Sequence, residues 1–215
     1  MELAKEVTEI TLRSVSVSGT ATLLASLWSI PLAYFLAKPG RVRGAVASLL
    51  EALVGIPTVL LGLALYMLFS RSGPLGFLNM LYTVKAVIVG QAILITPLIT
   101  ATAHRVLRMA RETYEEMALS LGAGRLQAMA ITLRESTPGL LSSIVMGFSR
   151  AIGELGVALM LGGNIRGSTR VLTTAIALSV SMGEHELALC LGAVLVVLSV
   201  AFSVITRLLG RLQTL

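Results

Sequence analysis

The chain has 215 residues, of which 55% are hydrophobic and 13% are charged, and its formal net charge is +6. A soluble domain carries roughly 25% charged residues, so this composition excludes an ordinary soluble protein and favours an integral membrane protein. The basic excess then bears on orientation in the membrane, because short cytoplasmic loops are enriched in Lys and Arg.

Long stretches without a charged side chain predict the membrane-spanning helices. Four such stretches reach the roughly 18 residues that suggest a span, at 14–37, 52–69, 86–103 and 187–206. A fifth stretch, at 136–163, is long enough but contains Arg150 and Glu154, and it is the fourth span in chain order. We therefore expect an all-α integral membrane protein, a single transmembrane domain over 1–215, with five spans at about 12–37, 46–70, 85–104, 136–162 and 187–207.

The second expected span contains a proline, and a charged residue lies near its beginning. Pro57 removes a backbone hydrogen bond and should bend the helix. Glu51 lies at the edge of this span. We expect its side chain to reach the membrane interface beside Arg41 and Arg43. The alternative is that Glu51 joins the charged residues of the fourth span.

Basic residues are distributed unequally over the predicted loops. Five spans place the two termini on opposite sides, and one side holds ten of the seventeen Lys and Arg residues against six on the other. The ten are Lys38, Arg41, Arg43, Arg105, Arg108, Arg111, Arg125, Arg134, Arg207 and Arg211. Since the basic side stays in the cytoplasm, we expect the N-terminus outside and the C-terminus inside.

The connection 105–135 between the third and fourth spans is therefore predicted to be cytoplasmic. Apolar residues recur there on one helical face at a period near 3.6, namely Met117, Leu121, Ala128 and Ile131. Gly122 and Gly124 interrupt the pattern, and glycine inside a helix costs about 1 kcal/mol relative to alanine. We expect two short helices that meet at a bend over "LGAG", with an apolar face against the rest of the bundle and a charged rim.

Two charges lie inside the fourth expected span. Arg150 and Glu154 are spaced i, i+4, so they share a helix face and can neutralise each other. A charge at bilayer depth costs at least about 2.5 to 3.5 kcal/mol on insertion scales, so both should face the bundle or an aqueous path. A structural ion pair and a role in the pathway or gate are both open.

The segment after the fourth span begins "GGNIRGSTR" and is predicted to be external. Asn164, Arg166, Arg170 and Thr173 offer cationic and neutral donors that suit a tetrahedral dianion. The apolar run 171–183 has 13 residues, which fits a re-entrant or interfacial helix better than a span. This helix could form an outer gate, and the alternative is a plain loop whose arginines meet lipid phosphates.

The stretch "EEMALSLGAGRLQAMAITLRESTPGLL" resembles the cytoplasmic coupling loop of ABC importer permeases. Glu116, Ala118 and Gly122 match the Glu-Ala-Ala, three residues, Gly pattern of that family, with Met in the second position. The tail departs from the pattern, because Ile131 comes one position early and "RES" replaces the usual Leu-Pro.

Two further stretches extend the resemblance to the oxyanion permeases for molybdate, sulfate and tungstate. They are "VGIPTVLLGLALYMLFSRSGPLGFL" at 54–78 and "GFSRAIGELGVALMLGGNIRGSTRVLTTAIAL" at 147–178. The part "GGNIRGSTRVLTTAIAL" is most similar to the tungstate branch. The resemblance implies the transmembrane fold of type I ABC importers, with coupling helices inside and a re-entrant helix outside.

What the resemblance implies about function is a transporter subunit and not an enzyme. Two separate ATPase subunits would bind the coupling residues, which are Glu116, Ala118, Gly122, Ala123 and Arg125. A second copy of the chain would complete the pathway, and an extracytoplasmic oxyanion-binding protein would deliver tungstate, with molybdate or sulfate as alternatives.

The residues themselves are consistent with a transporter subunit that does not hydrolyse ATP. The sequence contains no Gly-x-x-x-x-Gly-Lys-Ser/Thr phosphate cradle, so ATP hydrolysis would belong to another polypeptide. An intramembrane enzyme would need converging catalytic groups at membrane depth, and the spans offer only Arg150 and Glu154. We expect no cofactor, no metal ion and no nucleic-acid partner. A membrane assembly subunit that does not transport is the alternative from another class.

Overall fold

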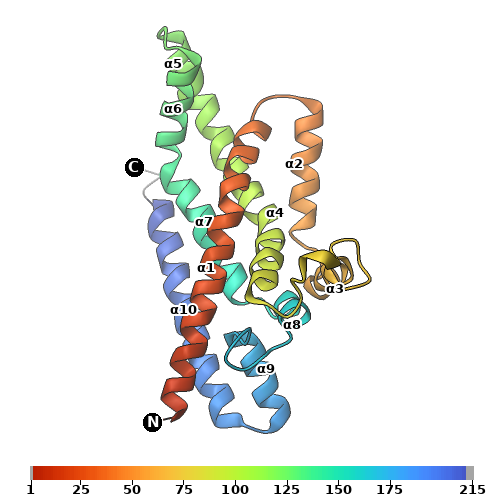
Figure 1. Ribbon diagram of the computed structural model, residues 1–215. Coiled ribbons are helices and arrows are strands. Elements are labelled where there is room, and N and C mark those ends of the chain that lie inside the picture. Colours follow the sequence, from red (N-terminus) through yellow and green to blue (C-terminus); the bar gives the residue numbers. More distant parts are fainter. Residues whose placement is uncertain (1, 212–215) are drawn as a thin grey trace. The chain divides into compact units, whose positions relative to one another are not determined.

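The computed structural model describes residues 2–211, and every regular element in that range is helical (Figure 1). The helices are α1 (Glu2–Leu36), α2 (Arg41–Leu53), α3 (Thr58–Phe69), α4 (Val84–Ala110), α5 (Glu116–Ser120), α6 (Arg125–Glu135), α7 (Thr137–Ile152), α8 (Gly156–Gly162), α9 (Leu172–Met182) and α10 (His185–Arg211). The outermost residues of the expected domain 1–215, and the side chains of Arg207 and Arg211 that entered the orientation argument, lie outside the described residues.

The chain folds into two compact units, each assembled from three separate parts of the sequence. The first unit comprises Met1–Leu24, Ile56–Ile95 and Phe148–Ala201. The second comprises Ala25–Gly55, Thr96–Gly147 and Phe202–Leu215. Helices α1, α4, α7 and α10 each contribute residues to both units.

Within residues 2–211, three continuous helices are long and apolar enough to cross a membrane, and two bent pairs bring the number to as many as five. The continuous ones are Ala4–Leu36, Val84–Ser120 and His185–Ile205. The residues that precede the first expected span are helical and belong to α1, which begins at Glu2. The short apolar helix α9 takes the place of the predicted re-entrant or interfacial helix.

The second and fourth expected spans are not straight helices. At residues 54–57 the chain leaves α2 and enters α3 at 102°, so the expectation of one bent span over 46–70 underestimated the break. Pro57 stands directly before α3 with an extended ψ of 120°, where its missing N–H costs nothing. Between α7 and α8 the bend is 61°, and Gly153 and Glu154 occupy the break.

Small residues let α3 and α8 pack closely in the first unit. A Cβ at Gly62 would lie 3.1 Å from Met160, and one at Gly156 would lie 2.8 Å from the Thr58 hydroxyl. Close backbone approach at glycine is the usual way in which membrane helices associate, because lipid offers no hydrophobic driving force. The core beside this contact contains buried Leu65, among other apolar residues of α3, α4 and α8.

A second apolar cluster in the first unit joins the N-terminal part of α1 to α9 and α10. Ile10, Leu172 and Leu191 are buried in it. The second unit has its own cluster, which contains Leu107 and Leu140. These cores hold the polar residues described below in fixed positions.

Candidate functional site

The turn between α5 and α6 is built around a glycine in the left-handed region. Gly122 has a φ of +88°. Its N–H donates to the carbonyl of Leu119 at 3.0 Å, and the Ala123 N–H donates to the carbonyl of Ala118 at 3.0 Å. These two bonds form the Schellman motif that ends helices at a glycine. The bend over "LGAG" and the short helix after it are therefore confirmed, whereas the segment before the bend is the end of the continuous helix Val84–Ser120.

The next helix begins with a side-chain cap. The Gln127 side chain accepts a hydrogen bond from the Gly124 N–H at 2.9 Å, immediately before α6. Arg125 is the first residue of α6 and is exposed. A Cβ at Gly122 would meet nothing within 4 Å, so glycine is needed there for its backbone conformation and not for space within the chain.

The apolar face of this segment differs from the expectation. Met117, Leu121 and Ile131 are exposed, and Leu121 keeps 81% of its surface. The expectation that these three pack against the bundle is wrong, whereas Ala128 of the same predicted face is buried, as are Ala118 and Thr132. The helices approach their neighbours through these alanines, and the large apolar side chains point away.

Glu116 lies on the rim of a cavity of about 660 Å³ in the second unit. The other glutamates of the rim are paired with arginines. Those pairs are Glu51 with Arg105 at 3.1 Å, Glu112 with Arg108 at 3.3 Å and Glu115 with Arg111 at 2.9 Å. Among the described residues, Glu116 has no ion pair, so its carboxylate is available to an outside cation.

Two of these pairs bear on the sequence analysis. In the described part of the chain, Glu51 pairs with Arg105 and forms no ion pair with Arg41 or Arg43. The Arg111–Glu115 pair is mostly buried, and the Tyr34 hydroxyl donates to Glu115 at 3.3 Å. This pair lies in a π-helical turn, Arg111–Glu115, that joins α4 to α5.

Arg150 and Glu154 form the expected ion pair, with Arg150 Nη1 donating to Glu154 Oε2 at 2.6 Å. Glu154 is only 3% exposed and lies in the break between α7 and α8. Its second carboxylate oxygen accepts the Val157 N–H at 3.2 Å, which satisfies a donor of the first turn of α8. The backbone carbonyl of Glu154 accepts the Thr173 hydroxyl at 2.7 Å, so this break is tied to α9.

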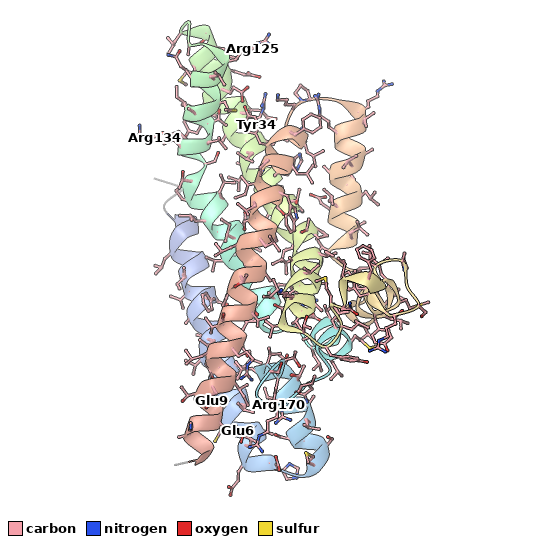
Figure 2. All side chains as sticks on the ribbon, in the orientation of Figure 1. Glu6, Glu9, Tyr34, Arg125, Arg134 and Arg170 are labelled. Atoms are coloured by element: carbon pink, nitrogen blue, oxygen red, sulfur yellow. The ribbon has the colours of Figure 1, made fainter. Side chains whose placement is uncertain are left out.

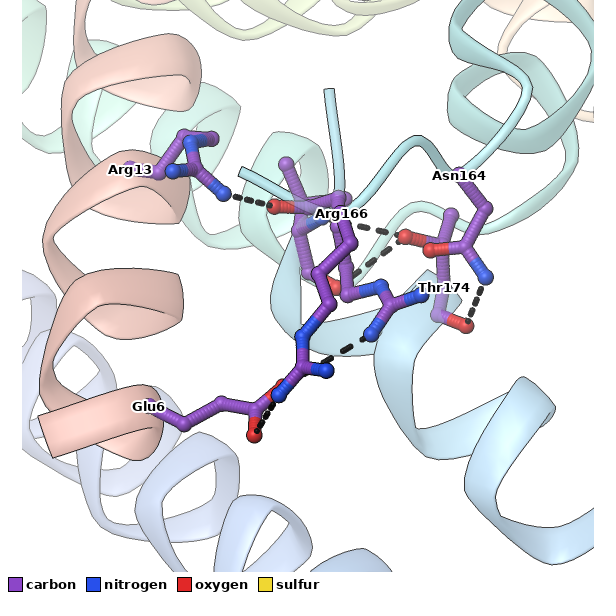
Figure 3. A network of polar contacts seen from close by, with 7 residues as sticks. Glu6, Arg13, Asn164, Arg166 and Thr174 are labelled. Atoms are coloured by element: carbon purple, nitrogen blue, oxygen red, sulfur yellow. Dashed lines mark hydrogen bonds and ion pairs between the residues drawn. The ribbon is translucent and has the colours of Figure 1, made fainter. Parts of the chain in front are cut away.

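The connection between α8 and α9 is held by its own polar residues (Figure 3). Asn164 adopts a positive φ of 53° and donates from its amide to the carbonyl of Thr174 at 3.1 Å. The Thr169 hydroxyl donates to the carbonyl of Gly162 and accepts the N–H of Ile165. Asn164 therefore shapes the loop, with its Nδ2 engaged inside the protein.

Both arginines of this connection approach a residue that the sequence analysis did not select. Arg166 donates to Glu6 at 2.8 Å, and Arg170 lies 3.7 Å from the same carboxylate. From α1, Arg13 donates to the carbonyls of Gly167 and Arg170 at 3.1 and 3.2 Å. The structure thus brings Arg166 and Arg170 together and adds Glu6 and Arg13, which lie about 160 residues away in the sequence.

Two further buried polar contacts tie α1 into the first unit. The Leu172 N–H, at the start of α9, donates to the Ser14 hydroxyl at 2.7 Å. The Ser18 hydroxyl donates to Gln91, whose amide donates to the carbonyl of Ala151. Within the described residues, no group of three or more His, Cys, Asp or Glu side chains is placed to hold a metal ion.

Comparison with known proteins decides the family of this chain. Residues 29–214 match the model of the binding-protein-dependent transport system inner membrane component. The chain belongs to this family. As an inner membrane component of such transport systems it is a multi-pass membrane protein and a non-enzymatic part of a transporter.

Individual relatives agree with this family. The chain is 40% identical to a tungstate uptake system permease protein of Peptoclostridium acidaminophilum over 193 residues, 89% of this chain and 85% of the relative. It is 32% identical to that of Campylobacter jejuni, covering 80% of this chain and 72% of the relative. An inward-facing structure of the MetNI methionine ABC transporter matches with a TM-score of 0.76 and 17% identity, over 99% of this chain and 97% of that one. That likeness shows the shared fold.

Proposed function

We propose that this chain is the permease subunit of an ATP-driven importer for tungstate. Two copies of the chain form the pathway, two ATPase subunits bind on the cytoplasmic side, and an extracytoplasmic oxyanion-binding protein delivers the anion. The named relatives support tungstate, since two tungstate permeases align over most of this chain. Molybdate and sulfate are the alternative substrates, because they are tetrahedral dianions too.

The observation that carries the ATPase interaction is the exposed apolar surface around the Gly122 turn. Large apolar side chains at a helix tip in water mark a surface that a protein partner covers. Leu121, Leu126 and Met117 form such a surface. Glu116 adds a carboxylate without an internal partner, which favours a basic side chain on the ATPase.

The orientation follows from the same assignment. If the ATPase binds the Gly122 turn, that turn is cytoplasmic, and five spans then place the N-terminus outside. The distribution of basic residues supports this arrangement, because ten of the seventeen fall on the predicted cytoplasmic side.

The gate is proposed to consist of α9 and the connection that precedes it. Support comes from the bond between the Thr173 hydroxyl and the carbonyl of Glu154, which links α9 to the break in the fourth span. A break is where a membrane helix changes direction with the least loss of internal hydrogen bonds. Movement of α7 would therefore reach α9 through Glu154, while the Arg150 pair keeps the buried carboxylate neutralised.

Transport then proceeds by alternating access. Closure of the ATPase dimer on ATP moves the two Gly122 turns, the outer gate opens toward the loaded binding protein, and hydrolysis restores the inward-open state. The contribution of this chain is conformational, and no covalent step takes place on its residues.

Replacing Gly122 with tryptophan tests the proposal. We expect the Gly122→Trp variant to insert in the membrane but to lose both ATPase co-purification and ATP-driven tungstate uptake. Gly183→Trp is the matched control for ATPase co-purification, because Gly183 also has a positive φ, 77°, and nothing within 4 Å of its Cβ position. Each substitution strains the backbone by about 1–2 kcal/mol, so strain alone would affect both equally.

ATPase binding by the Gly122→Trp variant at the control's level would refute the docking surface. Uptake also separates the permease from a membrane assembly subunit that does not transport. Vesicles that contain the complete complex should accumulate labelled tungstate only with ATP and the binding protein. Normal co-purification without any ATP-driven uptake of tungstate, molybdate or sulfate would favour the assembly subunit.

A further inference from the structure

Arg170 is a mostly buried cation whose guanidinium is incompletely bonded. Its side chain is 16% exposed, and its Nε is buried with no hydrogen-bond partner among the described residues. The carboxylate of Glu6 lies 3.7 Å from Nη1, which is beyond hydrogen-bond distance. Buried donors are nearly always satisfied in native proteins, and an exception points to a missing water or ion.

The surroundings of Arg170 are rich in positive charge. Arg166 contacts the same carboxylate at 2.8 Å, and Arg13 donates to the backbone carbonyl of Arg170. These three guanidinium groups are balanced by the single charge of Glu6, so the four side chains together carry a charge of +2. Figure 3 shows Glu6 and Arg166 facing each other, with Arg13 reaching the same loop from α1.

Space exists beside these groups. Glu6, Arg166 and Arg170 line a cavity of about 580 Å³ in the first unit. Glu184 and Glu186 also line it, but both are exposed and neither forms an ion pair within the described residues. Water and salt screen such exposed charges, whereas the mostly buried guanidinium of Arg170 is screened much less.

We propose that Arg166 and Arg170 form a binding subsite for the transported oxyanion, and that Glu6 occupies this subsite until the anion displaces it. The inference rests on the proposed function and names a regulating residue for its gate. A dianion brings two negative charges and four acceptor oxygens to two guanidinium groups, where Glu6 brings one charge and two oxygens. It can therefore bond Arg166 and the Nη side of the Arg170 guanidinium more completely than Glu6, which stays 3.7 Å from Nη1.

The geometry makes displacement of Glu6 feasible. Arg166 is 75% exposed, and ion pairs with one exposed partner contribute little to stability. Glu6 belongs to α1, so it can leave without unfolding the loop, which Arg13 and Ser14 still hold through backbone contacts. Release of the carboxylate would also remove one tie between α1 and the connection to α9.

Direct binding of tungstate to the permease–ATPase complex tests the proposal. The complex is placed in lipid nanodiscs without binding protein, and bound tungstate is measured by equilibrium dialysis and elemental analysis. We expect Glu6→Gln to tighten binding about two- to fivefold, the range that corresponds to losing a weak competing ion pair. Glu9→Gln is the matched control, because Glu9 lies one turn away on α1 (Figure 2), is exposed and has no ion pair among the described residues.

Two more variants complete the design. Adding Arg170→Gln to Glu6→Gln should remove the gained affinity, because the anion loses its buried donor. Glu6→Asp keeps the charge but shortens the reach, so it should give a smaller gain and serves if the Gln variant does not fold.

Unchanged or weaker binding by the Glu6 variants, or an equal gain with Glu9→Gln, would overturn the subsite. ATP-driven uptake by the unaltered transporter is measured in parallel. If the unaltered transporter takes up tungstate normally but Glu6→Gln does not tighten tungstate binding, only the subsite is refuted. Absence of both uptake and binding refutes the tungstate function as well.

Discussion

Loss of the Glu154 carboxylate should destabilise the protein through two separate contacts. Glu154→Ala leaves Arg150 without its partner at 2.6 Å and leaves the Val157 N–H without its acceptor at 3.2 Å. Breaking a buried pair costs about 3–5 kcal/mol, but Arg150 is 38% exposed and regains some hydration. We therefore take about 2 kcal/mol for the stranded cation and about 1 kcal/mol for the unsatisfied N–H.

A total near 3 kcal/mol lowers the melting temperature of a protein of this size by roughly 6–12 °C. The assay is thermal unfolding of the purified permease in detergent, followed by intrinsic fluorescence or by loss of soluble protein. Glu154→Gln keeps the size of the side chain and an acceptor for Val157, so its loss should be about 2 kcal/mol, without the contribution of the N–H.

A second substitution separates the charge from the packing. Arg150→Met in the Glu154→Ala background removes the stranded cation, so the double variant should be more stable than Glu154→Ala alone. If the stability losses of Glu154→Ala and of Arg150→Met, each measured alone, add up to the loss of the double variant, the ion pair does not contribute to stability. The reasoning about a neutralised charge in the helix break is then refuted.

Three other substitutions test the packing and the hydrogen bonding of the first unit. Gly90→Ala should destabilise the protein by about 1–3 kcal/mol through overpacking, because its Cβ would lie 2.4 Å from Leu161. Gly192→Ala is the control, because nothing lies within 4 Å of its Cβ position. It should be neutral or slightly stabilising in the same thermal assay. Ser14→Ala should cost about 1–2 kcal/mol by orphaning the buried N–H of Leu172, measured as faster hydrogen exchange of that amide. Unaltered exchange at Leu172 would show that α1 does not hold the start of α9.

The helical class, the number of apolar segments and the position of the middle turn could be predicted from the sequence. Hydropathy reports length and polarity, and Gly122 marks a turn because only glycine readily adopts a φ of +88°. Hydropathy does not report whether an apolar segment forms one straight helix or two helices that meet at a sharp angle. The 102° break before Pro57 therefore appeared in the sequence only as a proline inside a span.

Contacts between distant residues were the main omission at the candidate site. Arg166 and Arg170 were selected for their chemistry, but their pairing with Glu6 joins positions about 160 residues apart, and no local pattern predicts such a contact. The exposed Leu121 was misjudged for a different reason. Helical periodicity identifies an apolar face but cannot say whether that face meets the same chain or another protein.

The Schellman bonds at Gly122 mean that the tip of the middle segment has its final shape before any partner arrives. Association then loses little backbone entropy at this position, so more of the contact energy of the apolar side chains is retained as affinity. The same two bonds, to the carbonyls of Leu119 and Ala118, fix the end of α5 against the turn, so under the proposed coupling an ATPase bound there would displace the turn as one rigid unit.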